Sequence, residues 1–405
     1  MNDNTSILKN IRVLDFGRYV AGPYCATLLG YLGAEVIRIE RINGGEDRYI
    51  APVTSQGEGG VFFQTACNKK SLAMDLSHPD AKSIVRELVA QADVVVVNLP
   101  PKACVALGLD YATLSEINPR IVLATQTAFG DQGPYVDKGG FDGVGQAMSG
   151  AMTITGVPGA PVKAAAPYVD FSTAVLSALG VLAALMERAV SGRGQQVSAA
   201  LHATALAVFG SHLIEQGVTG INRVGTGNRV QTSAPSDVFA TQDGHLLTHC
   251  VGNGLFKRWA KLMAAGDEAE LHRWLTNPLY ASDDLRGTHS ADILAAMRNW
   301  CAMRSTAEAL AALDQAGIPA GPVLTPQQAL DDPQAAAMQW FKEISDYPGL
   351  QRAAPVPNLP LRFSRSQAGI DKRPPTLGEH TDEVLAAIGI EAAHRASLRQ
   401  RGVIR

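Results

Sequence analysis

The fold is decided by the stretch Ile11-Arg-Val-Leu-Asp-Phe16, the helically spaced apolar residues of 23–33, and Ala34-Glu-Val-Ile-Arg-Ile-Glu40. This stretch predicts a strand, a helix and a second strand, because β-rich runs flank a segment of helical period. The cycle continues with strands expected over residues 72–76, 94–97 and 120–124, and helices over 79–92 and 112–117. Alternating strands and helices are typical of parallel strands joined by crossovers. The sequence therefore predicts an α/β fold with a Rossmann-like open parallel sheet.

The 405-residue length predicts two or three domains. An apolar helix is expected over residues 171–190, and glycines with Pro235 then interrupt the pattern before a β-type segment at 238–251. Amphipathic helices over 253–316 carry Trp259, Trp274 and Trp300. We expect a large domain over 1–220, a smaller α+β domain over 221–325, and a C-terminal part over 326–405, with a last helix at 381–388, that returns to the large domain.

Composition excludes several classes of protein. The 35 Lys and Arg residues against 38 Asp and Glu give a net charge of −3, so no basic field exists to hold nucleic acid or anionic lipid. The five cysteines are widely spaced without a C-x-x-C motif, which favours a reducing compartment. Residues 1–10 lack the apolar run of a secretory signal, and the apolar stretch at 171–186 is shorter than the ~20 residues of a bilayer span. We expect a cytoplasmic protein with no membrane partner.

Common catalytic and nucleotide motifs are missing. The first turn, Asp15-Phe-Gly-Arg-Tyr-Val-Ala-Gly-Pro23, is neither a G-x-G-x-x-G nor a P-loop fingerprint, and no G-x-S-x-G occurs. The nine histidines are scattered, and His245 with His249 falls in an expected strand, where this spacing puts both on one face. We read that pair as a polar edge strand, and expect neither a metal site nor a hydrolase triad.

Asp170 stands alone in Ala164-Ala-Ala-Pro-Tyr-Val-Asp-Phe-Ser-Thr-Ala174, at the start of an apolar helix that should be buried. One interpretation makes it the helix N-cap, accepting hydrogen bonds from the backbone N–H groups of Ser172 or Thr173. The other makes it a nucleophile, kept ionised by the helix dipole and reactive by poor hydration, as covalent acyl transfer requires. Both interpretations stay open at this stage.

The first βα turn supplies a second candidate region. Ligands of open α/β sheets bind at the carboxyl ends of strands, where Arg18, Tyr19, Val20 and Ala21 precede the helix. Basic residues that either bind ligand phosphates or are ordinary surface charges are Arg38, Arg41, Lys69, Lys70, Lys102 and Lys138.

Taken together, these segments resemble the class III coenzyme A transferase family, the CaiB/BaiF type, over nearly the whole chain. The resemblance rests on Val13-Leu-Asp-Phe16, Ala21-Gly-Pro23, Leu32-Gly-Ala-Glu-Val-Ile-Arg-Ile-Glu40, Asn68-Lys-Lys-Ser71, Gln146-Ala-Met-Ser-Gly150, Asp170, Gly317-Ile-Pro-Ala-Gly-Pro322 and Leu377-Gly-Glu-His-Thr381. It implies an interlocked homodimer and a transfer of coenzyme A from an acyl-CoA to a carboxylic acid, with Asp170 forming first an acyl anhydride and then a CoA thioester. The CoA thioester is then a substrate, and no permanently bound cofactor is expected.

The resemblance also implies coenzyme A contacts: backbone at Val20 and Ala21, a charge at Arg41, and the strand ends at Met74-Asp75 and Asn98-Leu99. With the basic residues above, the candidate contacts are Arg18, Val20, Ala21, Arg41, Met74, Asp75, Asn98, Leu99, Lys102 and Lys138.

Departures from the family pattern keep alternatives open. Ala106 stands where relatives often carry Arg, so Lys102 is our candidate replacement for that charge. Val251-Gly-Asn-Gly254 lacks the four-glycine loop of formyl-CoA transferase, and we lean towards a dicarboxylyl-CoA donor such as succinyl-CoA, with Arg223, Asn228 and His249 as candidate acid contacts.

An α-methylacyl-CoA racemase needs a histidine where this chain has Phe141, so that activity is the alternative. A CoA hydrolase or a non-catalytic acyl-CoA binding protein also remains open.

Overall fold

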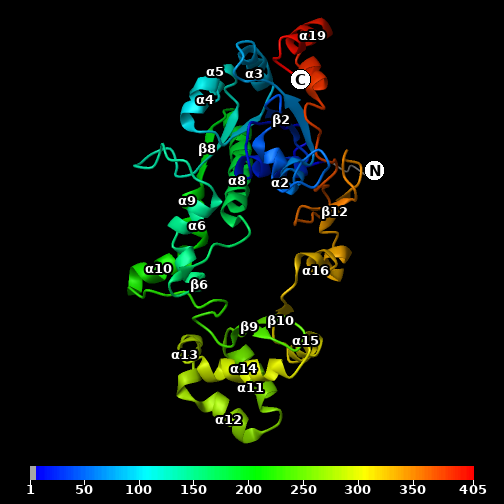
Figure 1. The fold of residues 1–405 in the computed structure, drawn as a ribbon. Helices are drawn as coiled ribbons and strands as arrows, with labels where there is room; N and C mark the ends of the chain where they lie inside the picture. Colours follow the sequence, from blue (N-terminus) through cyan, green and yellow to red (C-terminus); the bar gives the residue numbers. More distant parts are fainter. Residues whose placement is uncertain (1–5) are drawn as a thin grey trace. The chain divides into compact units, whose positions relative to one another are not determined.

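A six-stranded parallel sheet forms the centre of the computed structural model, which describes residues 6–405 (Figure 1). Its strand order is β3-β2-β1-β4-β5-β8. The strands are β1 (Arg12–Asp15), β2 (Glu35–Glu40), β3 (Lys69–Ala73), β4 (Val94–Val97), β5 (Val122–Thr127) and β8 (Gln196–Ala200). The order runs outward in opposite directions from the β1–β4 pair, which is the switch point where such sheets bind ligands. The predicted open α/β sheet is confirmed.

Helices cover both faces of this sheet. One face packs α1 (Ala21–Tyr31) and α8 (Tyr168–Ser191) onto Val13, Val36 and Val94. The other face packs α3 (Ala81–Ala90), α5 (Tyr111–Ile117), α18 (Thr381–Ala387) and α19 (Ala392–Gln400) onto alternate residues such as Leu14. Figure 1 shows the C-terminal helices, in red, beside the blue N-terminal sheet. The remaining elements of this part are η1 (Glu46–Tyr49), α2 (Gly60–Ala66), α4 (Pro101–Leu107), α6 (Asp142–Met148), α9 (Leu201–Val208), α10 (Gly210–Thr219), α17 (Pro333–Ala337), β12 (Phe341–Ile344) and β13 (Ala354–Pro357).

The chain divides into two compact units. The larger contains Met1–Ser149, Ala164–Thr219 and Pro333–Arg405, and the smaller contains Gly150–Lys163 and Gly220–Asp332. In the smaller unit, Trp259, Trp274 and Trp300 are buried in one core. Its elements are α7 (Ala151–Ile154), β6 (Gly156–Val157), β7 (Ala160–Pro161), β9 (Ser236–Ala240), β10 (His245–His249), α11 (Asn253–Ala264), α12 (Glu268–Thr276), η2 (Pro278–Tyr280), α13 (Asp283–Thr288), α14 (Ala291–Ala302), α15 (Thr306–Gln315), β11 (Ala320–Pro322) and α16 (Pro326–Leu330).

The structure differs from the sequence predictions at β3, α4 and α19, among other elements. β3 begins at Lys69, three residues earlier than predicted. The strand begins with lysines rather than apolar residues, and the buried Lys69 ammonium is stabilised by its ion pair with Asp15. The prediction missed α4, where Pro101 begins the helix and the left-handed Gly108 ends it. It also missed α19, a polar helix with Leu398 as its one buried residue.

α8 differs from prediction in length and burial. It has 24 residues, and among residues 6–405 it is the one helix long and apolar enough to cross a membrane by length and composition. Only one face is buried, on α1, β5 and β8. The opposite face exposes large apolar side chains, including Leu179 and Val190, so the predicted all-round burial is wrong for the single chain.

Candidate active site

Asp170 is the third residue of α8 and is almost buried, with 9% of its surface exposed. The helix N-cap position belongs to Pro167, and the Asp170 carboxylate makes no capping hydrogen bond. The N-cap interpretation of Asp170 is therefore wrong. Its carboxylate is left available at the helix entrance, where backbone N–H groups favour negative charge.

The acid that caps α8 is Asp142, the first residue of α6. Asp142 Oδ2 accepts hydrogen bonds from the backbone N–H of Val169 at 2.8 Å and of Asp170 at 3.2 Å. Its other carboxylate oxygen accepts from Gln146 Nε2, while Gln146 Oε1 accepts from the backbone N–H of Ala164 at 2.9 Å. Asp142 is thus held rigidly, and it fixes the backbone on which Asp170 stands.

Burial and, after it, the nearby charge of Asp142 together raise the pKa of Asp170 to about 7. The expected effect of the helix dipole, which favours the ionised form of Asp170, is therefore opposed by burial and by the Asp142 charge. A carboxylate with a pKa near neutrality is both poorly hydrated and basic, which makes it a better nucleophile than an exposed one. Asp142 directly follows Phe141 in the sequence, and no local pattern singles it out as the acid that caps α8.

A cavity of about 700 Å³ lies beside Asp170. It collects residues from the carboxyl ends of β1, β4 and β5 and from the segment before α6. Of the predicted site residues, those that line it are Arg18, Val20, Ala21, Arg41, Asn98, Leu99, Lys102, Lys138 and Asp170. The structure therefore brings together Asp170 and eight of the ten candidate contacts in one place.

Asn98 and Arg18 join the two strands at the switch point. Asn98 Oδ1 accepts from the Arg18 backbone N–H at 2.7 Å, and Asn98 Nδ2 donates to the Arg18 carbonyl oxygen at 2.7 Å. The next residue, Tyr19, has a φ of 61°, a left-handed conformation that turns the chain sharply into α1. The two hydrogen bonds between the Asn98 amide and the Arg18 backbone hold the turn that places Val20 and Ala21 in the cavity wall.

The cavity's cations lie towards its exposed rim. Arg18 and Arg41 both pair with Glu46, and Arg41 is 64% exposed. Lys102 is 85% exposed and pairs with Asp137 at 3.1 Å. Lys138 Nζ lies 4.1 Å from the centre of the Tyr135 ring. Such weakly held surface charges can exchange their partners for ligand phosphates at little cost.

Other basic candidates do not reach the cavity. Lys69 is fully buried, with its Nζ 2.7 Å from Asp15 Oδ2 and 2.6 Å from the Pro23 carbonyl oxygen. Arg38 is equally buried, 2.7 Å from Asp47 Oδ2. Lys70 pairs with acidic residues of β2 and α18. Burial keeps Lys69 and Arg38 from binding a ligand phosphate, and Lys70 is absent from the cavity lining.

Met74 and Asp75 are also outside the cavity lining. The Met74 side chain is fully buried in the core that α18 and α19 share. Asp75 Oδ1 accepts hydrogen bonds from the backbone N–H and the hydroxyl of Ser77, two residues further along the chain. Their contact with coenzyme A stays a prediction of the resemblance.

Sequence reasoning missed Gln126, which lines the cavity at the end of β5. Gln126 lies two residues beyond the strand predicted over 120–124, and a single glutamine after an apolar run carries no motif. Phe141 also lines the cavity, 61% exposed, with its ring 5.3 Å from that of Tyr19.

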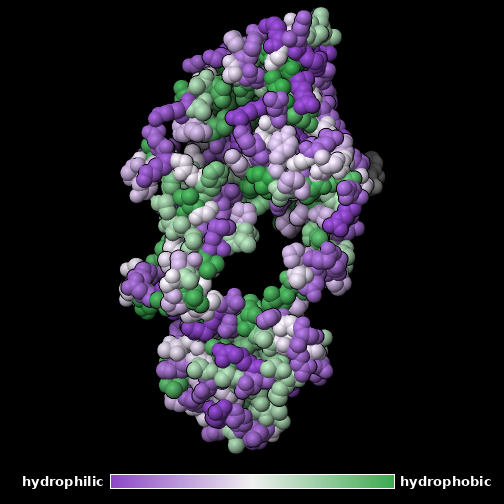
Figure 2. All heavy atoms as spheres, viewed as in Figure 1, coloured by the Kyte–Doolittle hydropathy of each residue, from purple (hydrophilic) through white to green (hydrophobic). Residues whose placement is uncertain are grey.

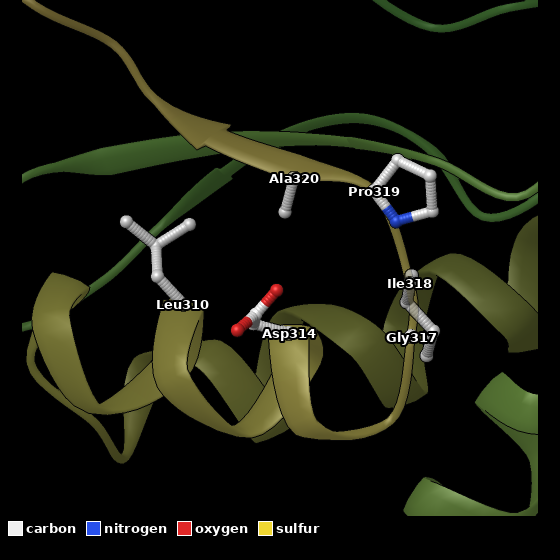
Figure 3. Close-up of a pocket in the computed structure, with 6 residues that line it drawn as sticks. All are labelled: Leu310, Asp314, Gly317, Ile318, Pro319 and Ala320. Atoms are coloured by element: carbon white, nitrogen blue, oxygen red, sulfur yellow. The ribbon is translucent and has the colours of Figure 1, made fainter. Parts of the chain in front are cut away.

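The smaller unit contains a second cavity of about 450 Å³, between α15 and β11. Figure 3 shows the Asp314 carboxylate pointing into it among apolar neighbours. No cation lines it, so it offers no charge for a carboxylic acid. His245 and His249 are both exposed on one face of β10. β10 is the central strand of the β11-β10-β9 sheet, so the interpretation of this segment as an edge strand is wrong. Residues 6–405 contain no group of three or more His, Cys, Asp or Glu able to hold a metal.

The comparisons with known proteins agree with this geometry. The model of CoA-transferase family III matches residues 8–381. The chain is 32% identical over 406 residues to the succinyl-CoA–D-citramalate CoA-transferase of Chloroflexus aurantiacus, covering 98% of each chain. It is 31% identical over 394 residues to the succinate–glutarate CoA-transferase of Agrobacterium fabrum, covering 94% of this chain and 95% of that one. A CaiB/BaiF family protein from Brucella suis superposes with a TM-score of 0.82 at 29% identity, covering 95% and 100% of the two chains.

The family model and the named relatives thus define an enzyme that transfers coenzyme A between acyl-CoA thioesters and carboxylic acids. The chain belongs to CoA-transferase family III.

Proposed function

We propose that this enzyme transfers coenzyme A through covalent intermediates on Asp170. An Asp170 oxygen attacks the thioester carbonyl, CoA thiolate leaves, and an aspartyl-acyl anhydride remains. The thiolate attacks the aspartyl carbonyl, which releases the donor acid and forms an aspartyl-CoA thioester. The acceptor carboxylate then attacks that thioester to give a new anhydride and thiolate, and thiolate attack on the new acyl carbonyl yields the product acyl-CoA and free Asp170. The observation that carries this proposal is the nearly buried, otherwise unbonded Asp170 carboxylate on the wall of the cavity.

Coenzyme A binds, in this proposal, along the cavity from its rim to Asp170. Arg41, Lys102 and Lys138 meet the phosphates at the rim, where their charges are exposed. Lys102 replaces the family arginine missing at Ala106, because both residues belong to α4 and Lys102 lines the cavity. The fixed turn at Val20 and Ala21 and the Asn98-Leu99 strand end hold the pantetheine arm.

For the substrates, we propose a dicarboxylyl-CoA donor such as succinyl-CoA. Two relatives with 31–32% identity carry succinyl-CoA or succinate in their names. The four-glycine loop of formyl-CoA transferase is also absent at Val251-Gly-Asn-Gly254, where the backbone N–H of Gly252 is instead bonded to Asp283.

We also propose a cytoplasmic homodimer of interlocked chains. The support is the apolar face of α8, where exposed fractions run from 45% at Leu176 to 91% at Val190. Figure 2 shows hydrophobic residues, in green, over the α8 and α9 region of the visible face. A second copy of the chain would cover these side chains. Light scattering on the purified protein tests this, with a dimer mass expected and a monomer contradicting it.

Steady-state exchange tests the function. Purified enzyme is given succinyl-CoA with a panel of carboxylic acids, and formation of the new acyl-CoA is followed by chromatography. Asp170→Asn is expected to abolish exchange while the dissociation constant for free CoA stays unchanged. Free CoA production without acceptor turnover would instead indicate a hydrolase, and epimerisation of a 2-methylacyl-CoA without exchange would indicate the racemase alternative.

A further inference from the structure

Gln126 is the buried polar group that the mechanism above leaves unexplained. Its side chain is 3% exposed, and neither Oε1 nor Nε2 has a hydrogen-bond partner among residues 6–405. A buried amide without partners costs on the order of 1–3 kcal/mol for each group. The polar neighbours in the strand do find partners: Thr125 Oγ1 bonds Ser198 Oγ at 3.1 Å, and Thr127 Oγ1 accepts from the Gly130 N–H at 2.8 Å.

Gln126 lies at a position in β5 where a bound ligand can supply the missing hydrogen-bond partner. Along β5 the side chains alternate, and Val122 and Ala124 belong to the core beneath α1 and α8. Gln126 is the next residue on that face, at the carboxyl end of the strand, and it lines the same cavity as Asp170. Gln126 therefore belongs to the cavity wall at the carboxyl end of β5, and its amide is buried there.

The chemistry of the cavity selects the ligand atom. Ala21, Val144 and Leu201 give this wall apolar surface, whereas the cations Arg41 and Lys102 are largely exposed. An acyl oxygen that gains negative charge during attack by Asp170 needs a donor in just such a poorly hydrated region. A neutral amide N–H meets that need without adding a charge that would pair with Asp170.

We propose that Gln126 is a catalytic residue whose Nε2 donates a hydrogen bond to the oxygen of the reacting acyl carbon. This inference rests on the proposed function, because it uses the same acyl group that Asp170 attacks. The bond strengthens as the carbonyl becomes an oxyanion, so its removal affects turnover more than binding. The same donor serves both half-reactions, since donor and acceptor acyl groups react at the same carboxylate.

The first experiment compares Gln126→Met with Ser177→Ala. Ser177 Oγ is also buried and without a partner but is absent from the cavity lining, which makes it a matched control. Gln126→Met is expected to lower kcat for exchange about 10- to 1,000-fold, as loss of an oxyanion donor does. Its thermal midpoint stays unchanged or rises, because no protein hydrogen bond is lost. Ser177→Ala keeps full activity. Unchanged kcat in Gln126→Met overturns the proposal.

A second experiment reads binding without turnover. Non-reactive ketone analogues of acetyl-CoA and succinyl-CoA, in which a methylene replaces the thioester sulfur, are titrated by calorimetry against free CoA. Gln126→Met is expected to weaken both analogues about 3- to 10-fold and to leave free CoA unchanged. Weakening of the succinyl analogue alone would place Gln126 at the distal carboxylate and overturn the proposal. This measurement still decides the role of Gln126 if the wild-type enzyme shows no exchange, an outcome that would count against the proposed function alone.

A third variant, Gln126→Glu, keeps the side-chain shape and removes the amide donor. It is expected to lose exchange at pH values where its carboxyl is ionised. Full activity of Gln126→Glu across the pH range overturns the proposal, whether or not Gln126→Met folds.

Discussion

Asp142 accepts the backbone N–H of Asp170 at 3.2 Å, and the same Asp142 charge raises the pKa of the Asp170 carboxyl that this backbone carries. One side chain therefore holds the backbone of the proposed nucleophile and adds to the pKa increase that burial causes. Asp142 thus has two effects that can be measured separately: its hydrogen bonds to the backbone at the start of α8, and the influence of its charge on the pKa of Asp170.

Replacing Asp142 by Asn keeps an oxygen for the two backbone N–H groups and removes the charge. The pKa of Asp170 is then expected to fall from about 7, because burial remains and the like charge is gone. Since Asp170 must be deprotonated to attack, the acidic limb of the kcat/KM profile should move to lower pH. Asp131→Asn, an exposed control on the loop before α6, should leave the profile in place. An unmoved limb in Asp142→Asn contradicts the coupling.

The Asp170 carboxyl should also make stability depend on pH. Its pKa is raised from 3.8 to about 7 in the folded protein, so between these values the folded state keeps a proton that the unfolded state loses. The free energy of unfolding therefore falls as pH rises through this range and is lowest above about pH 7. A change of one in a pKa corresponds to about 1.4 kcal/mol.

Asp170→Asn has no carboxyl to titrate at this position. Its free energy of unfolding relative to wild type should therefore rise from about pH 4 to pH 7 and then stay level. Urea unfolding at several pH values measures the difference. A difference that does not vary with pH would show that Asp170 titrates normally.

Most strands of the sheet were predictable, because the apolar runs at 11–16, 34–40 and 94–97 have the pattern of buried parallel strands. Neither the strand order nor β8 was predicted. The start of β3 was not predictable, since Lys69 reads as a surface residue and its partner Asp15 is distant in sequence. The cap of α8 was missed for a similar reason: Asp142 lies 28 residues before Asp170, and local capping rules search only the neighbouring turn. Gln126 became a candidate only when the fold showed a buried amide without partners.

Removing one partner of the buried Lys69–Asp15 ion pair should lower the free energy of unfolding strongly. Lys69 Nζ is fully buried between Asp15 Oδ2 and the Pro23 carbonyl oxygen. Lys69→Met leaves a buried carboxylate without its counter-ion and is expected to cost about 3–5 kcal/mol in urea unfolding. Lys70→Met, next to it on β3 but partly exposed, is the control and should cost less than about 1 kcal/mol. Equal effects of the two variants would contradict this ranking.

The cysteines should be unreactive in the folded protein. All five are buried and free, and burial raises the pKa of each thiol, to about 11 at Cys104 and Cys301 and to about 12 at Cys25, Cys67 and Cys250. Little thiolate exists at neutral pH, so a disulfide reagent should react slowly with the native protein. After denaturation the same reagent should react with all five thiols. Rapid reaction of one thiol in the native protein would show that its site opens.

The most direct test of the covalent account is to trap Asp170 during turnover. Wild-type enzyme is incubated with succinyl-CoA and hydroxylamine and then digested, and the peptide that contains Asp170 is analysed by mass spectrometry. The variant Asp142→Asn, which keeps Asp170, is treated in the same way. The account predicts a hydroxamate at Asp170 in both proteins, formed by attack of hydroxylamine on the activated aspartyl carbonyl and dependent on the acyl-CoA. An enzyme that exchanges CoA at full rate while its Asp170 peptide stays unmodified would contradict it.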